Sequence, residues 1–384
     1  AMIASLAAAP PQPPDEDAAA EWTRILTLSL TDWERAASEA GKLPTEKFRA
    51  FAAALWDGDV RARALVLTAF ARGRKGVRFL VRAGSDRRRL DAVMARYPNS
   101  DARLVVGSLG SPREAAQLFD GVGVVLHLAA ALSGPSAEMF LGTVVTTKNL
   151  FEAAAQRESP PKIVLISSFG VYGVADLPRG HVVTEETPTE PHPERRDHYS
   201  HSKLRQEEVA FDYHKKHRVP LTVLRPGVIY GPGGGAFSAR VGLALPGGFL
   251  FLGGNNLLPL SYVDNCAEAI CVAAENAHFN GDVYNVHDDD LVTARDYLRR
   301  YQKSVKKVRN VSVPYVATMA LSHAVAWYHR HSKGQLPPIF TPYKTRAMWK
   351  GNGFSNAKLR SIGFAPIVST EEGLCRNFEY LRNK

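Results

Sequence analysis

The stretches Lys162-Ile-Val-Leu-Ile-Ser-Ser168 and Val219-Pro-Leu-Thr-Val-Leu-Arg-Pro226 are short apolar runs, rich in β-branched residues, that end in polar residues. Such runs predict strands that are buried on both faces, as in a parallel sheet. Tyr199-Ser-His-Ser-Lys203 lies between them in a stretch that we expect to be helical. The order strand, loop, helix, strand predicts a parallel crossover unit and so decides the fold class.

The same alternation of short apolar runs and helical stretches extends over most of the chain. It predicts an α/β fold with a doubly wound parallel sheet, in which ligands bind at the carboxyl ends of the strands. We expect Val283–Val286 to be a late strand of a smaller lobe. The strands expected in the main sheet are Ala64–Thr68, Val77–Arg82, Arg103–Gly107, Val124–Leu128, Ile163–Ser167 and Leu221–Arg225.

Tyr199 and Lys203 are four residues apart, so they share one face of a helix. A phenol titrates near pH 10, and a lysine ammonium one turn away favours the phenolate. Ser168 can hydrogen-bond the oxygen that gains or loses the proton. The three side chains suit proton transfer at a carbinol oxygen while a hydride moves on carbon. A Tyr-x-x-x-Lys pair alone is also typical of an ordinary surface helix, and the flanking strands make this one specific.

Together these segments resemble the extended short-chain dehydrogenase/reductase superfamily. That group contains nucleotide-sugar epimerases, dehydratases and 3β-hydroxysteroid-dehydrogenase-like reductases. The resemblance covers roughly residues 61–384 and implies a Rossmann-like fold with a smaller C-terminal lobe. Further segments that carry it are Val124–Ala130, Thr143–Ala154, Leu260–Ala269 and Phe354–Pro366.

The resemblance also implies roles for individual residues. Ser168, Tyr199 and Lys203 match the catalytic set, with Tyr199 as acid/base and Lys203 holding the nicotinamide ribose; Ser167 is the alternative serine. Pro226 is equally well explained as a strand terminator, and the glycine cluster around Gly233 as a surface turn. The expected cofactor contacts are Arg82, Leu128, Ala129, Ala130, Tyr199, Lys203, Pro226 and Val228, and the expected substrate contacts are Ser168, Tyr172 and Gly233.

One element of the resembled pattern is missing. Family members carry Gly-x-x-Gly-x-x-Gly after the first strand, where the backbone approaches the cofactor pyrophosphate. Here Leu65-Val-Leu-Thr68 runs directly into Ala69-Phe-Ala-Arg-Gly73, and too few residues remain for a crossover helix. Either the sequence given lacks residues between Thr68 and Ala69, or the turn is deleted and dinucleotide binding is impaired.

The end of the second expected strand indicates which cofactor is preferred. An acidic residue there would bind the ribose hydroxyls of NAD. This chain has Arg82 instead, followed by Arg87-Arg-Arg89, and arginine suits a 2′-phosphate. We therefore expect NADP, with NAD as the alternative.

We expect four regions along the chain. Residues 1–20 are rich in Ala, Pro and acidic residues and predict disorder, and residues 21–60 predict a helical extension. Residues 61–230 correspond to the dinucleotide-binding domain, and residues 231–384 mainly to a substrate-binding lobe that is interleaved with it. The resemblance makes a homodimer the default expectation.

Composition limits the function classes. The net charge of +10 favours anionic partners or a merely solvated basic surface, and no nucleic-acid motif accompanies it. Three cysteines form no disulfide or metal pattern, which suits the cytoplasm, and the histidines show no ligand spacing. The sequence contains no run of eighteen apolar residues, so we expect no membrane-spanning helix. The apolar stretch Val313–Tyr328 could lie on a membrane surface or cover the substrate pocket.

These observations predict an NAD(P)-dependent oxidoreductase acting on a secondary alcohol or ketone. The substrate would be a lipidic or sterol-like ketone or a nucleotide sugar. The alternative is a non-catalytic nucleotide- or ligand-binding regulatory protein on the same fold, with a degraded glycine-rich loop.

Overall fold

The computed structural model describes residues 27–30, 77–81, 87–119, 121–132, 136–245, 248–331 and 341–384. The expectations for residues 1–20, for Ala64–Thr68, for the Thr68–Ala69 junction and for Arg82 lie outside these residues.

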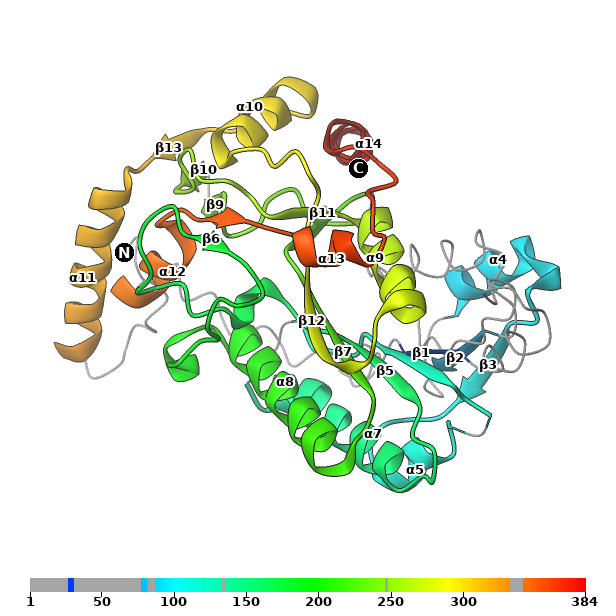
Figure 1. Cartoon of the computed structure of the whole chain (residues 1–384). Helices are drawn as coiled ribbons and strands as arrows, with labels where there is room; N and C mark the ends of the chain where they lie inside the picture. Colours follow the sequence, from blue (N-terminus) through cyan, green and yellow to red (C-terminus); the bar gives the residue numbers. More distant parts are fainter. Residues whose placement is uncertain are drawn as a thin grey trace.

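The main sheet has five hydrogen-bonded strands. Across the sheet they run in the order β1 (Thr27–Leu30), β4 (Val124–His127), β5 (Lys162–Ile166), β7 (Leu221–Pro226) and β12 (Asn280–Val286). β4, β5, β7 and β12 pair in parallel, whereas β1 pairs antiparallel with β4. A parallel pair, β2 (Arg78–Val81) and β3 (Arg103–Val106), extends the layer on the far side of β1 (Figure 1).

Side chains alternate between two buried faces of this sheet. Val125 and Leu165 face a core shared with α5 (Pro112–Ala116), α7 (Thr146–Ala155) and α8 (His198–His217). Leu126 and Val164 face a second core formed with α4 (Arg88–Arg96) and α9 (Val263–Asn276). Helices therefore cover both faces (Figure 1), and the continuous apolar runs in the sequence follow from that double burial.

Two expectations are corrected here. Thr27–Leu30 forms strand β1, although we expected a helical extension. Its alternating Thr-Leu-Ser-Leu pattern is that of a strand, and the backbone of β4 offers it a partner. Val283–Val286 belongs to β12 of the main sheet and not to a smaller lobe, because it continues the parallel ladder along β7.

The remaining strands and the longer remaining helices form the lobe above the carboxyl end of the sheet (Figure 1). Small sheets pair β8 with β11, β9 and β13 with β10, and β6 with β14. The strands are β6 (Val182–Val183), β8 (Val228–Tyr230), β9 (Gly242–Leu245), β10 (Gly248–Phe251), β11 (Leu260–Tyr262), β13 (Asn310–Ser312) and β14 (Gly353–Phe354). The helices are α10 (Ala294–Ser304), α11 (Tyr315–His331), α12 (Pro342–Trp349), α13 (Ala357–Ser361) and α14 (Thr370–Arg382). Shorter helical elements contact α4, α7 or α8: η2 (Pro98–Ser100), α6 (Ser136–Phe140), η3 (Leu141–Val145), η4 (Phe169–Val171) and η5 (Pro193–Arg195).

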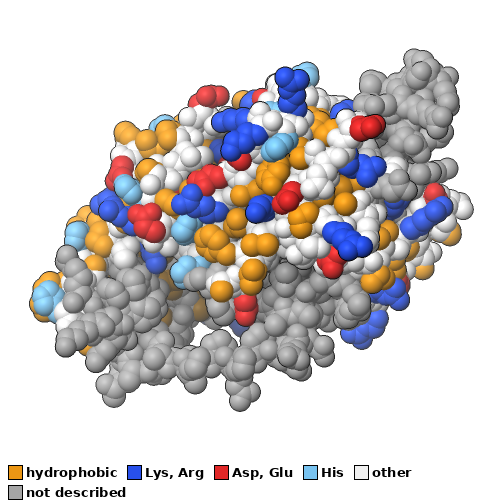
Figure 2. Space-filling view, turned by 90° about the horizontal axis from the view of Figure 1, so that it is seen from below, with side chains coloured by type: hydrophobic (Ala, Val, Ile, Leu, Met, Phe, Trp, Pro, Cys, Tyr) orange, Lys and Arg blue, Asp and Glu red, His pale blue; other side chains and the backbone are white. Residues whose placement is uncertain are grey.

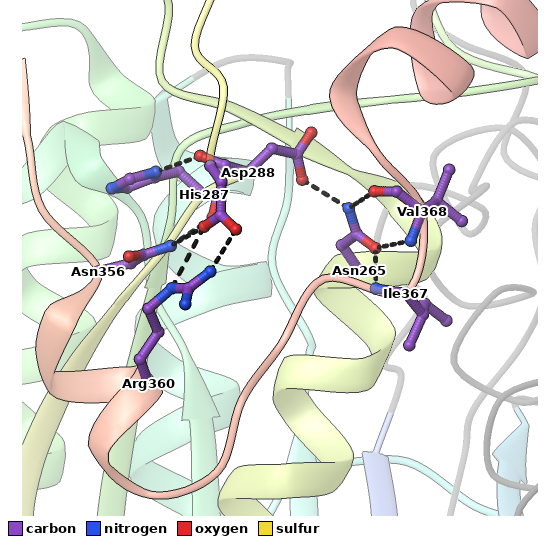
Figure 3. Close-up of polar contacts among 8 residues, drawn as sticks. Asn265, His287, Asp288, Asn356, Arg360, Ile367 and Val368 are labelled. Atoms are coloured by element: carbon purple, nitrogen blue, oxygen red, sulfur yellow. Dashed lines mark hydrogen bonds and ion pairs between the residues drawn. The ribbon is translucent and has the colours of Figure 1, made fainter.

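A buried polar cluster fastens the C-terminal segment to the sheet (Figure 3). Asn265 of α9 accepts from the backbone N–H groups of Ile367 and Val368, both at 2.9 Å. Its Nδ2 donates to the Val368 carbonyl and to the carboxylate of Asp288, both at 2.8 Å. Asn356 donates to the His287 carbonyl at 2.9 Å. The end of β12, the start of α9 and the C-terminal segment therefore form one unit.

Asp288 contributes the most deeply buried carboxyl group of this cluster. Burial raises the pKa of its carboxyl group to about 6, although hydrogen bonds from Asn265 and the Tyr262 N–H oppose the shift. The folded protein therefore holds this proton more tightly than the unfolded chain does. It follows that the contribution of Asp288 to the free energy of unfolding is largest below about pH 4 and declines as the pH rises to 6 and above.

We predict that Asp288→Asn costs more stability at pH 4.5 than at pH 7, by about 2 kcal/mol. The reason is that ionisation of the buried Asp288 destabilises the wild type at pH 7, whereas asparagine is neutral at both pH values. Urea unfolding of both proteins at the two pH values measures the difference. Asp290→Asn, at an exposed neighbouring position, is the control and should change the free energy of unfolding by the same amount at both pH values. An Asp288→Asn effect that does not vary with pH would contradict the prediction.

Candidate functional site

A cavity of about 340 Å³ opens at the carboxyl ends of β5 and β7. Three sets of residues form its wall: the segment after β4, the end of β5 with the first turns of α8, and the glycine-rich segment after β7. Its lining residues are Leu128, Ala130, Leu132, Ile166, Ser167, Ser168, Tyr199, Lys203, Pro226, Gly227, Ile229, Tyr230, Gly231, Gly233, Gly234 and Gly235. This edge is where a doubly wound sheet binds its ligands.

Lys203 is held firmly at the wall of the cavity. It is almost fully buried, and its Nζ donates to the carbonyl oxygen of Ile166 at 2.7 Å and to Oε1 of Gln206 at 2.9 Å. Ile166 is the last residue of β5, so the ammonium group is tied directly to the sheet. These two bonds fix the position of the positive charge that lies one helical turn from Tyr199.

Gln206 can present only its oxygen to Lys203. Its Nε2 donates to the Ala129 carbonyl at 3.2 Å and to the hydroxyl of Thr147 at 2.8 Å. Because a carbonyl can only accept a hydrogen bond, the NH₂ group must face Ala129, and Oε1 is left for the ammonium group. Gln206 is fully buried, so water cannot replace these partners.

The same network determines the protonation of His127. The Thr147 hydroxyl donates to the Thr143 carbonyl at 2.6 Å, so it accepts from Gln206 and from Nε2 of His127 at 2.8 Å. His127 is fully buried, and burial, together with the charge of Lys203, lowers its pKa to about 3. His127 is therefore neutral with its hydrogen on Nε2, and Lys203 carries the positive charge of this cluster.

The two serines after β5 both line the cavity. Ser168 is half-buried, and its Oγ accepts from the Gly170 N–H at 3.1 Å, which leaves its hydroxyl hydrogen to be donated to a ligand. The Ser167 hydroxyl is buried and has no hydrogen-bond partner in the described part of the chain. Ser168 thus has the better-defined donor geometry.

A buried ion pair fixes α8 against the sheet. The guanidinium of Arg225 in β7 donates to both carboxylate oxygens of Glu207, at 2.9 and 2.6 Å. Arg225 also lies over the ring of Tyr172 at 4.6 Å, and the Tyr172 hydroxyl donates to Asn285 at 2.6 Å. Glu207 is one turn after Lys203, so this pair sets the position of the helix that carries Tyr199 and Lys203.

The glycine-rich wall depends on glycine at two positions. A Cβ at Gly227 would lie 2.1 Å from the Pro259 carbonyl oxygen, which is impossible without moving the backbone. Gly233 has a φ of 98°, a conformation that other residues rarely adopt. The expected contact at Gly233 therefore lies in a loop with defined geometry and not in an arbitrary surface turn.

The structure brings most of the expected site residues together at the cavity, but Tyr172, Ala129, Val228 and the stretch Val313–Tyr328 do not line it. Tyr172 does not line the cavity, because its ring packs on Arg225 and its hydroxyl is used by Asn285. Val228 is directed into the core, and its neighbours Gly227 and Ile229 line the cavity instead. No described residue of Val313–Tyr328 lines it either. Ala129 contributes its carbonyl to Gln206 and does not line the wall.

Three residues of the site were not anticipated from the sequence: His127, Thr147 and Gln206. Gln206 could have been found, because it lies three residues after Lys203 and so one turn further along the same helix face. The two others contact it only through the fold, from β4 and α7.

The described residues fit one half of a nicotinamide dinucleotide. A lysine ammonium, two hydroxyl groups and an apolar wall meet in one cavity, as a nicotinamide and its ribose require. The residues expected to hold the pyrophosphate lie outside the described part, and the strand beside β4 runs antiparallel. The exposed Arg87 and Arg88 mark the start of α4, shortly after β2.

A family model described as "NAD dependent epimerase/dehydratase family" matches residues 62–286. The chain belongs to this family. The expected family and fold class are confirmed. In the part of the chain that the structure describes, no helix is long and apolar enough to cross a membrane.

The proteins that this chain resembles share little sequence with it. A 3beta-hydroxysteroid-dehydrogenase/decarboxylase of Arabidopsis thaliana is 23% identical over 295 residues, which is 72% of this chain and 51% of that protein. The chain thus spans about half the length of the curated relative that it matches. The crystal structure of UDP-glucuronic acid 4-epimerase from Bacillus cereus with UDP-glucuronic acid and NAD has a TM-score of 0.60 at 18% identity, covering 84% of this chain and 96% of that one. UDP-glucose 4-epimerase of Thermus thermophilus with NAD also has a TM-score of 0.60, at 20% identity, covering 85% and 97%.

We predict that Gln206→Glu shifts the pH profile of turnover. A carboxylate beside Lys203 partly offsets the ammonium charge that favours the Tyr199 phenolate, so the activity of alcohol oxidation should rise at a pH about one unit higher. Gln206→Met removes the acceptor without adding charge and should lower kcat about tenfold with a smaller shift.

The matched control is Ser202→Ala. Ser202 is buried on the same helix, but its hydroxyl donates only to the Tyr199 carbonyl, so the profile should stay unchanged. Circular dichroism verifies that all three variants fold. An unshifted profile in Gln206→Glu would show that Gln206 does not act through Lys203.

Proposed function

We propose that this protein is an NAD(P)-dependent oxidoreductase that interconverts a secondary alcohol and a ketone. The observation that carries this proposal is the convergence of Ser168, Tyr199 and an anchored Lys203 on one cavity at the carboxyl edge of the sheet. The nicotinamide cofactor, when bound, supplies or accepts the hydride.

The chain's own residues handle the proton. Tyr199 transfers it to the carbonyl oxygen in reduction and removes it from the hydroxyl in oxidation. Ser168 donates a hydrogen bond to the same oxygen and so stabilises the charge that develops there. Lys203 favours the phenolate form of Tyr199, and its two fixed acceptors, the Ile166 carbonyl and Gln206, hold its charge in place.

For the substrate we propose a bulky, mainly apolar ketone or alcohol. Leu128, Leu132, Ile166 and Ile229 contribute apolar side chains to the cavity. Among the described lining residues only Lys203 is charged, so no arginine is present there to pair with a diphosphate. The sterol activity in the name of the Arabidopsis relative also supports this class.

We predict that Tyr199→Phe lowers kcat by about a hundredfold or more, because general acid–base catalysis contributes factors of this size. Turnover is followed through nicotinamide absorbance with a 3β-hydroxysteroid and, in parallel, with UDP-glucose. Cofactor binding should be retained, since Lys203 is untouched. Tyr213→Phe, a tyrosine further along the same helix, is the control and should keep full activity.

Full turnover by Tyr199→Phe would refute the proposed chemistry. Activity with UDP-glucose alone would refute the substrate class while leaving the mechanism intact. A protein that binds neither NADPH nor NADH would favour the alternative of a non-catalytic binding protein.

For the cofactor we propose NADP over NAD. The supporting residues are Arg82 and the exposed Arg87 and Arg88 at the start of α4, which suit a 2′-phosphate. The NAD found in the epimerase structures belongs to those proteins and leaves this choice open.

We predict that replacing both Arg87 and Arg88 by Ala weakens NADPH binding at least about tenfold and leaves NADH binding within about twofold, because only NADPH carries the 2′-phosphate. Fluorescence titration of each cofactor measures both constants. Arg113→Ala, on the exposed surface of α5, is the charge control. Equal losses for the two cofactors would contradict the assignment.

A further inference from the structure

Helix α11 (Tyr315–His331) buries hydroxyl-bearing side chains against the protein and exposes apolar ones, which is the reverse of the usual arrangement. Thr318 and Ser322 are the residues it buries completely, at 0% exposure, and their hydroxyls bond to their own backbone at the Pro314 and Met319 carbonyls. The helix therefore packs against the protein, next to α12, with a narrow hydroxyl-bearing face (Figure 1).

Its outward face is mainly apolar and aromatic, with one exposed histidine, His323. Val316 is 78% exposed, Trp327 56%, and Leu321 and Tyr328 46% each, with exposed alanines between them. Burying such side chains in a soluble core would be favourable by about 1.5–3 kcal/mol each, so a face of this kind calls for an apolar partner. The helix is too short to cross a bilayer, being about 26 Å long at 1.5 Å per residue.

The charge of the surrounding sequence indicates what that partner is. Residues 297–370 contain thirteen lysines and arginines and no aspartate or glutamate. Five of these cations form ion pairs with acidic residues outside this range: Arg299, Arg300, Arg346, Lys358 and Arg360. Lys306, Lys307 and Arg309 are exposed just before α11, and none forms an ion pair within the described residues. The face of the molecule seen in Figure 2 carries acidic and basic side chains intermixed.

We propose that α11 lies on the surface of an anionic lipid bilayer, with Val316, Leu321, Trp327 and Tyr328 in the headgroup region. Apolar residues with aromatic groups at one end and lysines nearby are the composition of an interfacial helix. Each lysine or arginine close to an anionic membrane adds to the attraction. A second copy of the chain is a poorer occupant, because a symmetric pair through α11 would bring the exposed basic residues within 306–309 of one copy toward those of the other. The proposal does not depend on the proposed function.

Co-sedimentation with vesicles tests this assignment. The protein should sediment with vesicles of phosphatidylcholine mixed with phosphatidylserine, stay in solution with phosphatidylcholine alone, and dissociate from the mixed vesicles as salt is raised. Trp327→Ser and Leu321→Ser should each weaken partitioning, by about tenfold for the tryptophan. Ile367→Ser is the matched control, because Ile367 is 57% exposed on another segment.

A second set of variants tests the charge. The triple variant with Gln at Lys306, Lys307 and Arg309 should weaken binding to the mixed vesicles at least about tenfold. The control replaces Lys215, Lys216 and Arg218 at the end of α8 by Gln and should bind normally, although it removes the same charge.

Three outcomes would overturn the proposal. The first is no sedimentation with mixed vesicles. The second is equal binding by the Trp327→Ser and Leu321→Ser variants and wild type. The third is a wild-type dimer in analytical ultracentrifugation that Trp327→Ser converts to a monomer while vesicle binding is unchanged, which would make α11 a contact between copies.

Discussion

The paired hydrogen bonds between Arg225 and Glu207 hold the functional half of the molecule in register. They join β7 to α8 in the protein interior, and through Tyr172 and Asn285 the same guanidinium is connected to β12. Removing one partner of such a pair leaves an uncompensated buried charge, at a cost of about 3–5 kcal/mol. Because Glu207 is one turn after Lys203, the placement of the charge on Lys203 depends on an ion pair whose two residues do not line the cavity.

The positive charge of Lys203 at the cavity wall is stabilised by buried polar groups behind it. A lysine that is almost fully buried would ordinarily tend to lose its proton. Here the Ile166 carbonyl and Gln206 solvate the ammonium group, while the neighbouring His127 stays neutral and adds no competing positive charge. Polar groups from β4, β5, α7 and α8 thus replace water around one charge, which is the preorganisation that the proposed acid–base chemistry requires.

Much of the fold and the central residues could be predicted from local sequence. Ser168, Tyr199 and Lys203 have fixed spacings and lie next to apolar runs whose double burial is visible in composition alone. Gln206, Thr147 and His127 could not be predicted as a network, because residues as far apart as 127 and 206 meet only in the folded sheet. The position of Tyr172 against Arg225 could not be predicted, because an aromatic residue near a motif is as readily a core residue as a ligand contact. The apolar stretch Val313–Tyr328 left two alternatives open, a membrane-surface segment or a cover of the pocket, because which face of α11 is buried against α12 follows only from the fold.

Strand β1 has a consequence for solubility. It occupies the outer edge of β4, whose four residues are fully buried and apolar apart from His127. If β1 were displaced, this ladder would expose unpaired N–H and C=O groups along an apolar strand, which is a template for pairing with another chain. The short antiparallel strand thus protects the molecule against edge-to-edge aggregation, a role separate from any ligand and one that depends on its backbone more than on its side chains.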